Sequence, residues 1–210
     1  MALIRTEKIG DHIYWGIWDA SNYHDVDMLL SIYPMTDAEK IEYNGLNHQF
    51  RKIEWLAGRL LLKKLIEQAG LDFKGTYKDV DGKCHLNENS AFVSLSHSRH
   101  MVAGLLSLNQ PVGIDIEFPH DKFTAIAKRF MNKEELAWTG NDITRITMAW
   151  TSKEAMYKQI GIKGMTIGQN FRIYCTAENE LKGKFEFGSV SQEHQLLHFK
   201  HDDWHIAISL

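Results

Sequence analysis

Three carboxylates and two lysines in the second half of the sequence have the types and spacing needed to hold a metal ion beside a phosphate group. Two of the carboxylates, Asp115 and Glu117, flank Ile116 in the apolar run Gly113-Ile114-Asp115-Ile116-Glu117. Such a run favours a β-strand, in which residues two apart point to the same face. We therefore expect both carboxylates to point the same way, although this pattern is also common on solvated sheet faces.

The third carboxylate lies in a helix predicted from Arg145 to Ile160. The apolar residues of this segment recur with helical period and form one stripe: Ile146, Ala149, Trp150, Tyr157 and Ile160. Lys153 falls inside that stripe, and because an unpaired buried ammonium group is costly, an anionic partner is predicted for it. Glu154 and Lys158 lie one turn apart beside the stripe.

These groups together match the needs of a magnesium-assisted phosphoryl transfer. Mg²⁺ prefers carboxylate oxygens, water and the phosphate oxygens of a substrate, so Asp115, Glu117 and Glu154 are candidate ligands. Lysines would neutralise the phosphate charge that the metal leaves uncovered. Each pattern taken alone also fits an ordinary solvated surface, and their combination favours a site.

Four motifs follow one another along the chain: Ser96-His97-Ser98, Gly113 to Glu117, Ala127-Lys128-Arg129-Phe130, and Trp150 to Lys158 followed by Gly161 and Gly164. In their order and spacing they resemble the larger type of 4′-phosphopantetheinyl transferase, which modifies carrier proteins in fatty-acid, polyketide and nonribosomal peptide synthesis. The resemblance covers residues 81–174 best.

The resemblance implies a reaction of coenzyme A with a serine of an apo acyl or peptidyl carrier protein. The serine hydroxyl attacks the β-phosphate, the 4′-phosphopantetheine group is transferred, and adenosine 3′,5′-bisphosphate leaves. Asp115, Glu117 and Glu154 would hold Mg²⁺ at the pyrophosphate. The general base stays open between Glu154 and Glu117, because metal ligation and proton acceptance compete for one carboxylate.

The resemblance also implies which residues contact the phosphates of coenzyme A. Lys158 is similar to a lysine that contacts the phosphate chain, and Lys153 would support it. Ser96 and His97 resemble a pair that holds the 3′-phosphate, and Lys83 follows a turn glycine where the family has a basic residue directed at the nucleotide. For His97 and Lys83, a solvated turn residue is the alternative.

A weak internal repeat predicts two similar halves. At one constant offset, three residues of the first half match three of the second: Trp55, Lys63 and Leu65 against Trp150, Lys158 and Ile160. Arg59 then corresponds to Glu154 and is a candidate phosphate contact, with Arg51 a further one. The expected fold is α+β, with halves 1–108 (nucleotide contacts) and 109–210 (metal site). Each half is expected to be a helix on a small, mostly antiparallel sheet, and a pseudo-twofold axis would relate the two halves. The resemblance implies that coenzyme A binds between them.

Composition and charge indicate the general class of protein. The 210 residues are 44% hydrophobic and 24% charged, as in ordinary globular proteins, and the net charge of −3 argues against a nucleic-acid binder. Without an apolar run long enough for a bilayer, we expect a cytoplasmic protein, and two fused halves predict a monomer.

Capping boxes are predicted at Thr36 with Glu39 and at Asn132 with Glu135. The C-terminal histidines are predicted on the solvated side of a hairpin turning at 202–203.

Two other functions remain open at this stage. One is a module that binds coenzyme A or the carrier protein without catalysis. The other is a metal-dependent phosphodiesterase that acts on nucleotides and needs no carrier protein. The complete acidic set favours an enzyme over the first alternative.

Overall fold

The computed structural model describes residues 3–22, 26–176 and 180–210, and the chain forms two compact units. Unit 1 is Met1–Pro111 and unit 2 is Val112–Leu210. The division falls in the connection between Ser107 and Gly113, which also holds the boundary predicted between residues 108 and 109. The pseudo-twofold relation of the halves stays a prediction.

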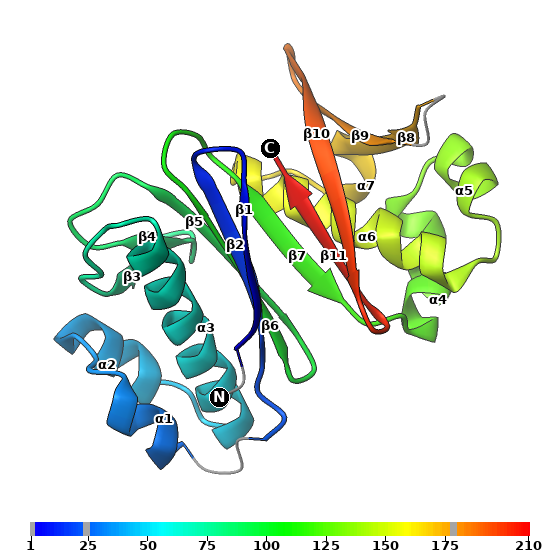
Figure 1. Ribbon diagram of the computed structural model, residues 1–210. Coiled ribbons are helices and arrows are strands. Elements are labelled where there is room, and N and C mark those ends of the chain that lie inside the picture. The colour runs from blue at the N-terminus through cyan, green and yellow to red at the C-terminus, as the bar shows by residue number, and fades with distance from the viewer. Residues whose placement is uncertain (1–2, 23–25, 177–179) are drawn as a thin grey trace. The chain divides into compact units, whose positions relative to one another are not determined.

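Unit 1 contains a four-stranded antiparallel sheet in the order β1-β2-β6-β5, a two-stranded sheet and a long helix (Figure 1). Its elements are β1 (Leu3–Ile9), β2 (Ile13–Asp19), α1 (Asp27–Ile32), α2 (Asp37–Asn44), α3 (Gln49–Gln68), β3 (Thr76–Lys78), β4 (Cys84–Leu86), β5 (Phe92–Ser98) and β6 (Met101–Ser107).

The long helix α3 packs closely on this sheet because two strands carry glycine at the point of contact. Gly16 of β2 pairs with Gly104 of β6. A Cβ atom at either glycine would come within 3.1 Å of the Leu61 side chain. The missing side chains leave room for Leu61, which is fully buried in the unit 1 core.

Unit 2 contains a five-stranded antiparallel sheet in the order β7-β11-β10-β9-β8, and helix α6 packs on it (Figure 1). Its elements are β7 (Gly113–Glu117), α4 (Asp121–Phe130), α5 (Lys133–Thr139), α6 (Ile143–Ile160), α7 (Ile167–Asn170), β8 (Phe171–Cys175), β9 (Leu181–Phe187), β10 (Val190–His201) and β11 (Trp204–Ser209).

The structure confirms the predicted fold class, a helix on a small antiparallel sheet in each unit. It also confirms both capping boxes, Thr36 with Glu39 and Asn132 with Glu135. Among the described residues, no helix combines the length and apolarity that a bilayer crossing requires.

The C-terminal histidines correct one expectation. The hairpin of β10 and β11 turns at 202–203 as predicted, but its histidines are not all on a solvated side. His194 and His205 are buried at 2% and 4% exposure, and His198 Nε2 lies 2.9 Å from the Ser152 hydroxyl of α6. Alternation along β10 places His194 and His198 on one face of the sheet, where His194 contacts Gln159 and His198 contacts Ser152 of α6.

We expect these histidines to make unit 2 sensitive to acid. Burial lowers the pKa of His194 and His205, and lowers that of His198 to about 4, from an ordinary value of 6.5. Their stabilising effect is complete above pH 6.5 and is lost as the pH falls toward 4, because the unfolded chain then binds more protons. Chemical denaturation should show the His198 contribution to the unfolding free energy falling by about 3 kcal/mol across this window, against the opposite contribution of acids whose pKa is raised. His198→Gln should reduce that slope, and an unchanged slope in the variant would contradict the assignment.

Candidate active site

Strand β7 presents the first two predicted ligands. Asp115 pairs with Ala207 and Glu117 pairs with His205 of the neighbouring strand β11, so the backbone of both residues is fixed in the sheet. Asp115 is only 4% exposed, while Glu117 is half-buried. Residues two apart on a strand share a face, as predicted.

Gly113 allows helix α6 to lie directly against the start of β7. A Cβ atom at this position would lie 1.9 Å from the carbonyl oxygen of Ala155 and 2.7 Å from the backbone nitrogen of Gln159. No side chain fits there without moving the helix. This close approach brings α6 to Asp115: Lys158 Nζ donates to Asp115 Oδ1 at 2.7 Å and to the carbonyl oxygen of Ile114 at 3.2 Å.

Glu154 lies one turn before Lys158 and is electrostatically coupled to both β7 acids. The pKa of Glu154 is raised to about 7, first by burial and next by the charge of Asp115; Lys158 opposes the rise, and Glu117 adds a smaller increase. Glu154 is therefore close enough to Asp115 and to Glu117 to be repelled by both charges. A positive charge placed among them would relieve this repulsion.

The three carboxylates fit a hard divalent cation by their chemistry, but they are not already arranged around one. Within residues 3–22, 26–176 and 180–210, no group of three His, Cys, Asp or Glu side chains could hold a metal ion as it stands. The cation at Asp115 is the ammonium of Lys158. Oxygen-only donors with a surplus of negative charge suit Mg²⁺, so its binding stays a prediction that requires the side chains to converge.

Lys153 does not join these acids. Its side chain is 0% exposed, and Nζ donates to Glu135 Oε2 at 2.7 Å and to the carbonyl oxygen of Phe130 at 2.6 Å. The anionic partner predicted for this lysine is thus Glu135 of α5. With its donors directed into the protein, Lys153 is not placed to support a phosphate contact.

In unit 1, two separately predicted phosphate contacts, Arg51 and His97, lie together. Arg51 Nη1 contacts His97 Nε2 and donates to Glu54 Oε2 at 3.0 Å. His97 Nε2 lies 3.7 Å from the same Glu54 oxygen. Ser96 is adjacent to His97 on β5, so its buried side chain points to the opposite face of the sheet.

Glu54 is a residue that the sequence analysis missed. Its side chain is 5% exposed, and burial raises its pKa while Arg51 opposes the rise. The sequence contained a signal for this pair, because Arg51 and Glu54 are three residues apart on one helix, a spacing that brings the two side chains together. This carboxylate orients the two groups predicted to bind phosphate.

The remaining basic candidates lie elsewhere in unit 1. Arg59 is buried, stacks 4.2 Å from the Trp55 ring centroid, and donates to Glu42 at 3.2 and 3.3 Å. Its guanidinium is thus held by an internal carboxylate. Lys83 lies beside the β3–β4 turn, where Asp79 accepts a bond from its backbone nitrogen at 2.9 Å. Burial lowers the pKa of Lys83, and Asp79 opposes that shift.

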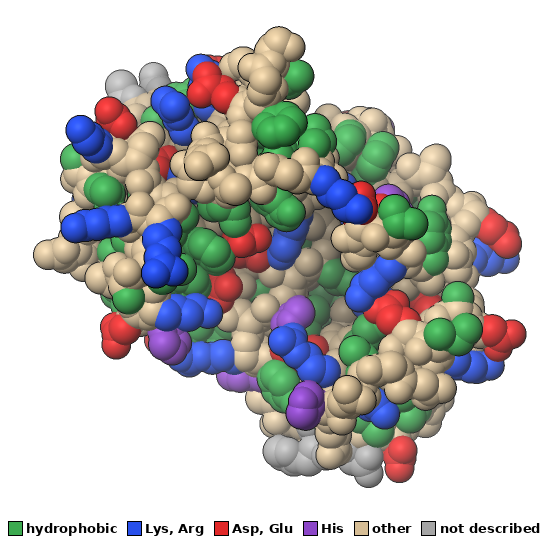
Figure 2. All heavy atoms as spheres, turned by 180° about the vertical axis from the view of Figure 1, so that it is seen from behind, with side chains coloured by type: hydrophobic (Ala, Val, Ile, Leu, Met, Phe, Trp, Pro, Cys, Tyr) green, Lys and Arg blue, Asp and Glu red, His purple; other side chains and the backbone are tan. Residues whose placement is uncertain are grey.

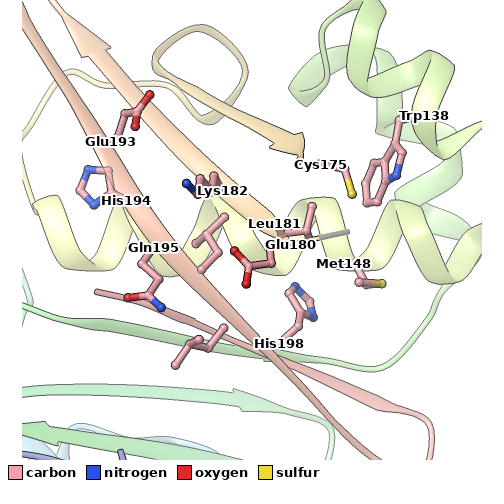
Figure 3. A pocket seen from close by; sticks show the side chains of 12 residues that line it. Trp138, Met148, Cys175, Glu180, Leu181, Lys182, Glu193, His194, Gln195 and His198 are labelled. Carbon is pink, nitrogen blue, oxygen red and sulfur yellow. The ribbon is translucent and has the colours of Figure 1, made fainter. Parts of the chain in front are cut away.

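A cavity of about 580 Å³ in unit 2 contains none of the predicted site residues (Figure 3). Strands β9 and β10 line much of it, together with Trp138 and Met148. Cys175 and Glu180 also line it, and they flank residues outside the described ranges, so we assign this cavity no role.

Surface charge is mixed in sign. On the face drawn in Figure 2, acidic and basic side chains are interspersed with apolar ones. This agrees with the small net charge of −3.

Comparison with known proteins shows what the region that carries the acids is similar to. Residues 111–209 match the sequence model of the 4′-phosphopantetheinyl transferase superfamily. The chain is also 33% identical over 138 residues to the 4′-phosphopantetheinyl transferase gsp of Aneurinibacillus migulanus, an alignment covering 62% of this chain and 56% of that relative. The chain thus spans a little over half the length of this relative. Residues 111–209 are therefore similar to this superfamily, which confirms the predicted resemblance.

Proposed function

We propose that the protein transfers 4′-phosphopantetheine from coenzyme A to a serine of an apo acyl or peptidyl carrier protein and releases adenosine 3′,5′-bisphosphate. The observation that carries the proposal is the packing of α6 on Gly113, because it sets Lys158 against Asp115 within the region that matches the family. The coupling of Glu154 to both β7 acids supports it.

The acids of unit 2 are proposed to hold the metal. Asp115, Glu117 and Glu154 would bind Mg²⁺, which would neutralise pyrophosphate charge in the transition state. Lys158, whose side chain is 27% exposed, can then direct its ammonium at a phosphate oxygen.

A carboxylate of the same set accepts the serine proton. The serine oxygen bonds to the β-phosphorus as the bond to the departing bisphosphate breaks. Glu154 suits the base because its pKa of about 7 lies near a neutral working pH, and Glu117 is the alternative.

The basic groups of unit 1 are proposed to contact the nucleotide phosphates. Arg51 and His97 are the leading pair, since Glu54 orients Arg51 and about half of the His97 side chain is exposed to receive a ligand. Lys83 is a further candidate. Arg59 and Ser96 are weaker candidates, because Arg59 is paired with Glu42 and Ser96 is buried on the other face of the sheet.

His97→Ala tests the 3′-phosphate contact. We expect the affinity for coenzyme A to fall about tenfold and that for dephospho-coenzyme A less than about twofold, because only the first ligand carries the 3′-phosphate. Isothermal titration with both ligands measures the difference. His12→Ala, at an exposed turn of the same unit, is the matched control. Equal losses of affinity for both ligands would show that His97 does not contact the 3′-phosphate.

One assay separates the proposed function from its alternatives. The protein is incubated with Mg²⁺, coenzyme A and several apo carrier proteins, and the carriers are weighed by mass spectrometry. A carrier heavier by one phosphopantetheine group supports transfer. Coenzyme A binding without modification indicates a binding module, and nucleotide cleavage without a carrier indicates a phosphodiesterase. A cytoplasmic location and a monomeric state are parts of the proposal that cell fractionation and size-exclusion chromatography test.

A further inference from the structure

A fully buried ion pair of unit 2 lies next to the candidate active site in the chain. Lys153 is 0% exposed and Glu135 is 1% exposed, and Lys153 Nζ lies 2.7 Å from Glu135 Oε2. Lys153 immediately precedes Glu154 on α6. Neither partner of the pair is exposed to solvent, so neither can bind substrate directly.

Glu135 and Lys153 together connect four elements of unit 2. Glu135 Oε2 also accepts a bond from the backbone nitrogen of Asn132 at 2.8 Å, at the start of α5. Glu135 Oε1 accepts from the backbone nitrogen of Ile173 in β8 at 2.7 Å. Lys153 Nζ donates to the carbonyl oxygen of Phe130 at 2.6 Å, at the end of α4. One ion pair therefore ties α6 to α4, α5 and β8.

Stability alone does not account for a buried pair of this kind. Well-packed apolar residues often replace buried ion pairs with no loss of stability. Directed hydrogen bonds differ from apolar contacts because they fix the rotation and position of the helix that carries them. A rotation of α6 that breaks the bond from Lys153 to Glu135 must also move Glu154 relative to Asp115.

We propose that Lys153 and Glu135 form a positioning pair that holds α6 in the orientation that directs Glu154 and Lys158 at Asp115. This inference rests on the proposed function of those acids. Displacements of about 1 Å in a catalytic group can reduce a rate by about 10²-fold, so a fixed helix has a direct effect on turnover.

Three variants separate positioning from folding. In Lys153→Met, Glu135 is left buried without its cation, and in Glu135→Gln, Lys153 loses its anion. Both single variants should therefore lose thermal stability. The double variant Lys153→Met/Glu135→Gln contains neither buried charge. The glutamine oxygen at position 135 can still accept a hydrogen bond from a backbone nitrogen. We expect its Tm to return to within about 4 °C of the wild-type value.

The double variant should nevertheless have a displaced site. Binding of Mn²⁺, used as a probe in place of Mg²⁺ and followed by electron paramagnetic resonance, should weaken about tenfold, because the carboxylates no longer converge as readily. With coenzyme A and a carrier protein, kcat should fall at least about tenfold while KM for coenzyme A changes less than about twofold. Lys184→Met, which breaks a partly exposed ion pair with Glu186 in the same unit, is the control and should match the wild type.

The outcomes are decisive for the pair and for the proposed function separately. Wild-type Mn²⁺ affinity and kcat in a folded double variant would overturn the positioning role. A raised KM with unchanged kcat would also overturn it. If the wild type binds Mn²⁺ but transfers nothing, the proposed function fails, and the Mn²⁺ affinities still decide the role of the pair. A wild type without Mn²⁺ affinity overturns both.

Discussion

Replacing Glu154 by glutamine should lower kcat for phosphopantetheine transfer by about 10³-fold while leaving unit 2 folded. Glutamine has nearly the same shape as glutamate but cannot carry the charge that binds a divalent ion or accept the serine proton. Burial raises the pKa of the Glu154 side chain, and the charges of Asp115 and Glu117 raise it as well. Removing one of three repelling acids should therefore leave Tm unchanged or slightly higher.

Steady-state kinetics with coenzyme A and an apo carrier protein that the wild type modifies, together with thermal unfolding, measure both effects. Glu134→Gln is the matched control, because it makes the same chemical change at an exposed position of α5. Its kcat should equal that of the wild type. A Glu154→Gln enzyme that retains more than about a tenth of wild-type kcat would exclude Glu154 from the metal site and from the role of base.

Gly113→Ala should cause the largest structural loss. The added Cβ would lie 1.9 Å from the Ala155 carbonyl oxygen, a backbone atom that moves only if α6 moves. Overpacking of this kind typically costs about 1–3 kcal/mol and occasionally more, and here we expect at least the upper value. Transfer should be lost even in the fraction that stays folded, because α6 carries Glu154 and Lys158 away from Asp115. Urea unfolding and kinetics at low temperature measure the two losses.

Gly58→Ala provides the comparison. This glycine lies within α3, and the nearest side-chain atoms to an added Cβ are 3.5–3.7 Å away, which is ordinary packing. Alanine favours a helix over glycine by up to about 1 kcal/mol, so this variant should be as stable as the wild type or more stable. A Gly113→Ala protein with wild-type stability would mean that α6 does not depend on close approach to β7.

Local patterns predicted the elements that carry the site. The acids of β7, the helical period of α6 and both capping boxes depend on neighbours within a few residues, which the sequence displays directly. Strand β1 was not predicted, because Arg5, Glu7 and Lys8 interrupt its apolar residues.

The partners of the buried cations could not be predicted in the same way. Lys153 pairs with Glu135, and Arg59 pairs with Glu42, in each case a carboxylate on a different helix. The cost of burying a cation shows that a partner exists, but only the tertiary packing decides which one. For this reason the sequence analysis assigned both cations to phosphate contacts, whereas in the structure both pair with carboxylates.

The central claim is that Asp115, Glu117 and Glu154 share one divalent ion. Isothermal titration of the wild type and of Asp115→Asn, Glu117→Gln and Glu154→Gln with Mg²⁺, in the presence of coenzyme A, tests it most directly. We expect one ion per wild-type chain and a large loss of affinity in each variant. A wild type that binds no Mg²⁺, or variants that bind it as tightly as the wild type does, would contradict the account.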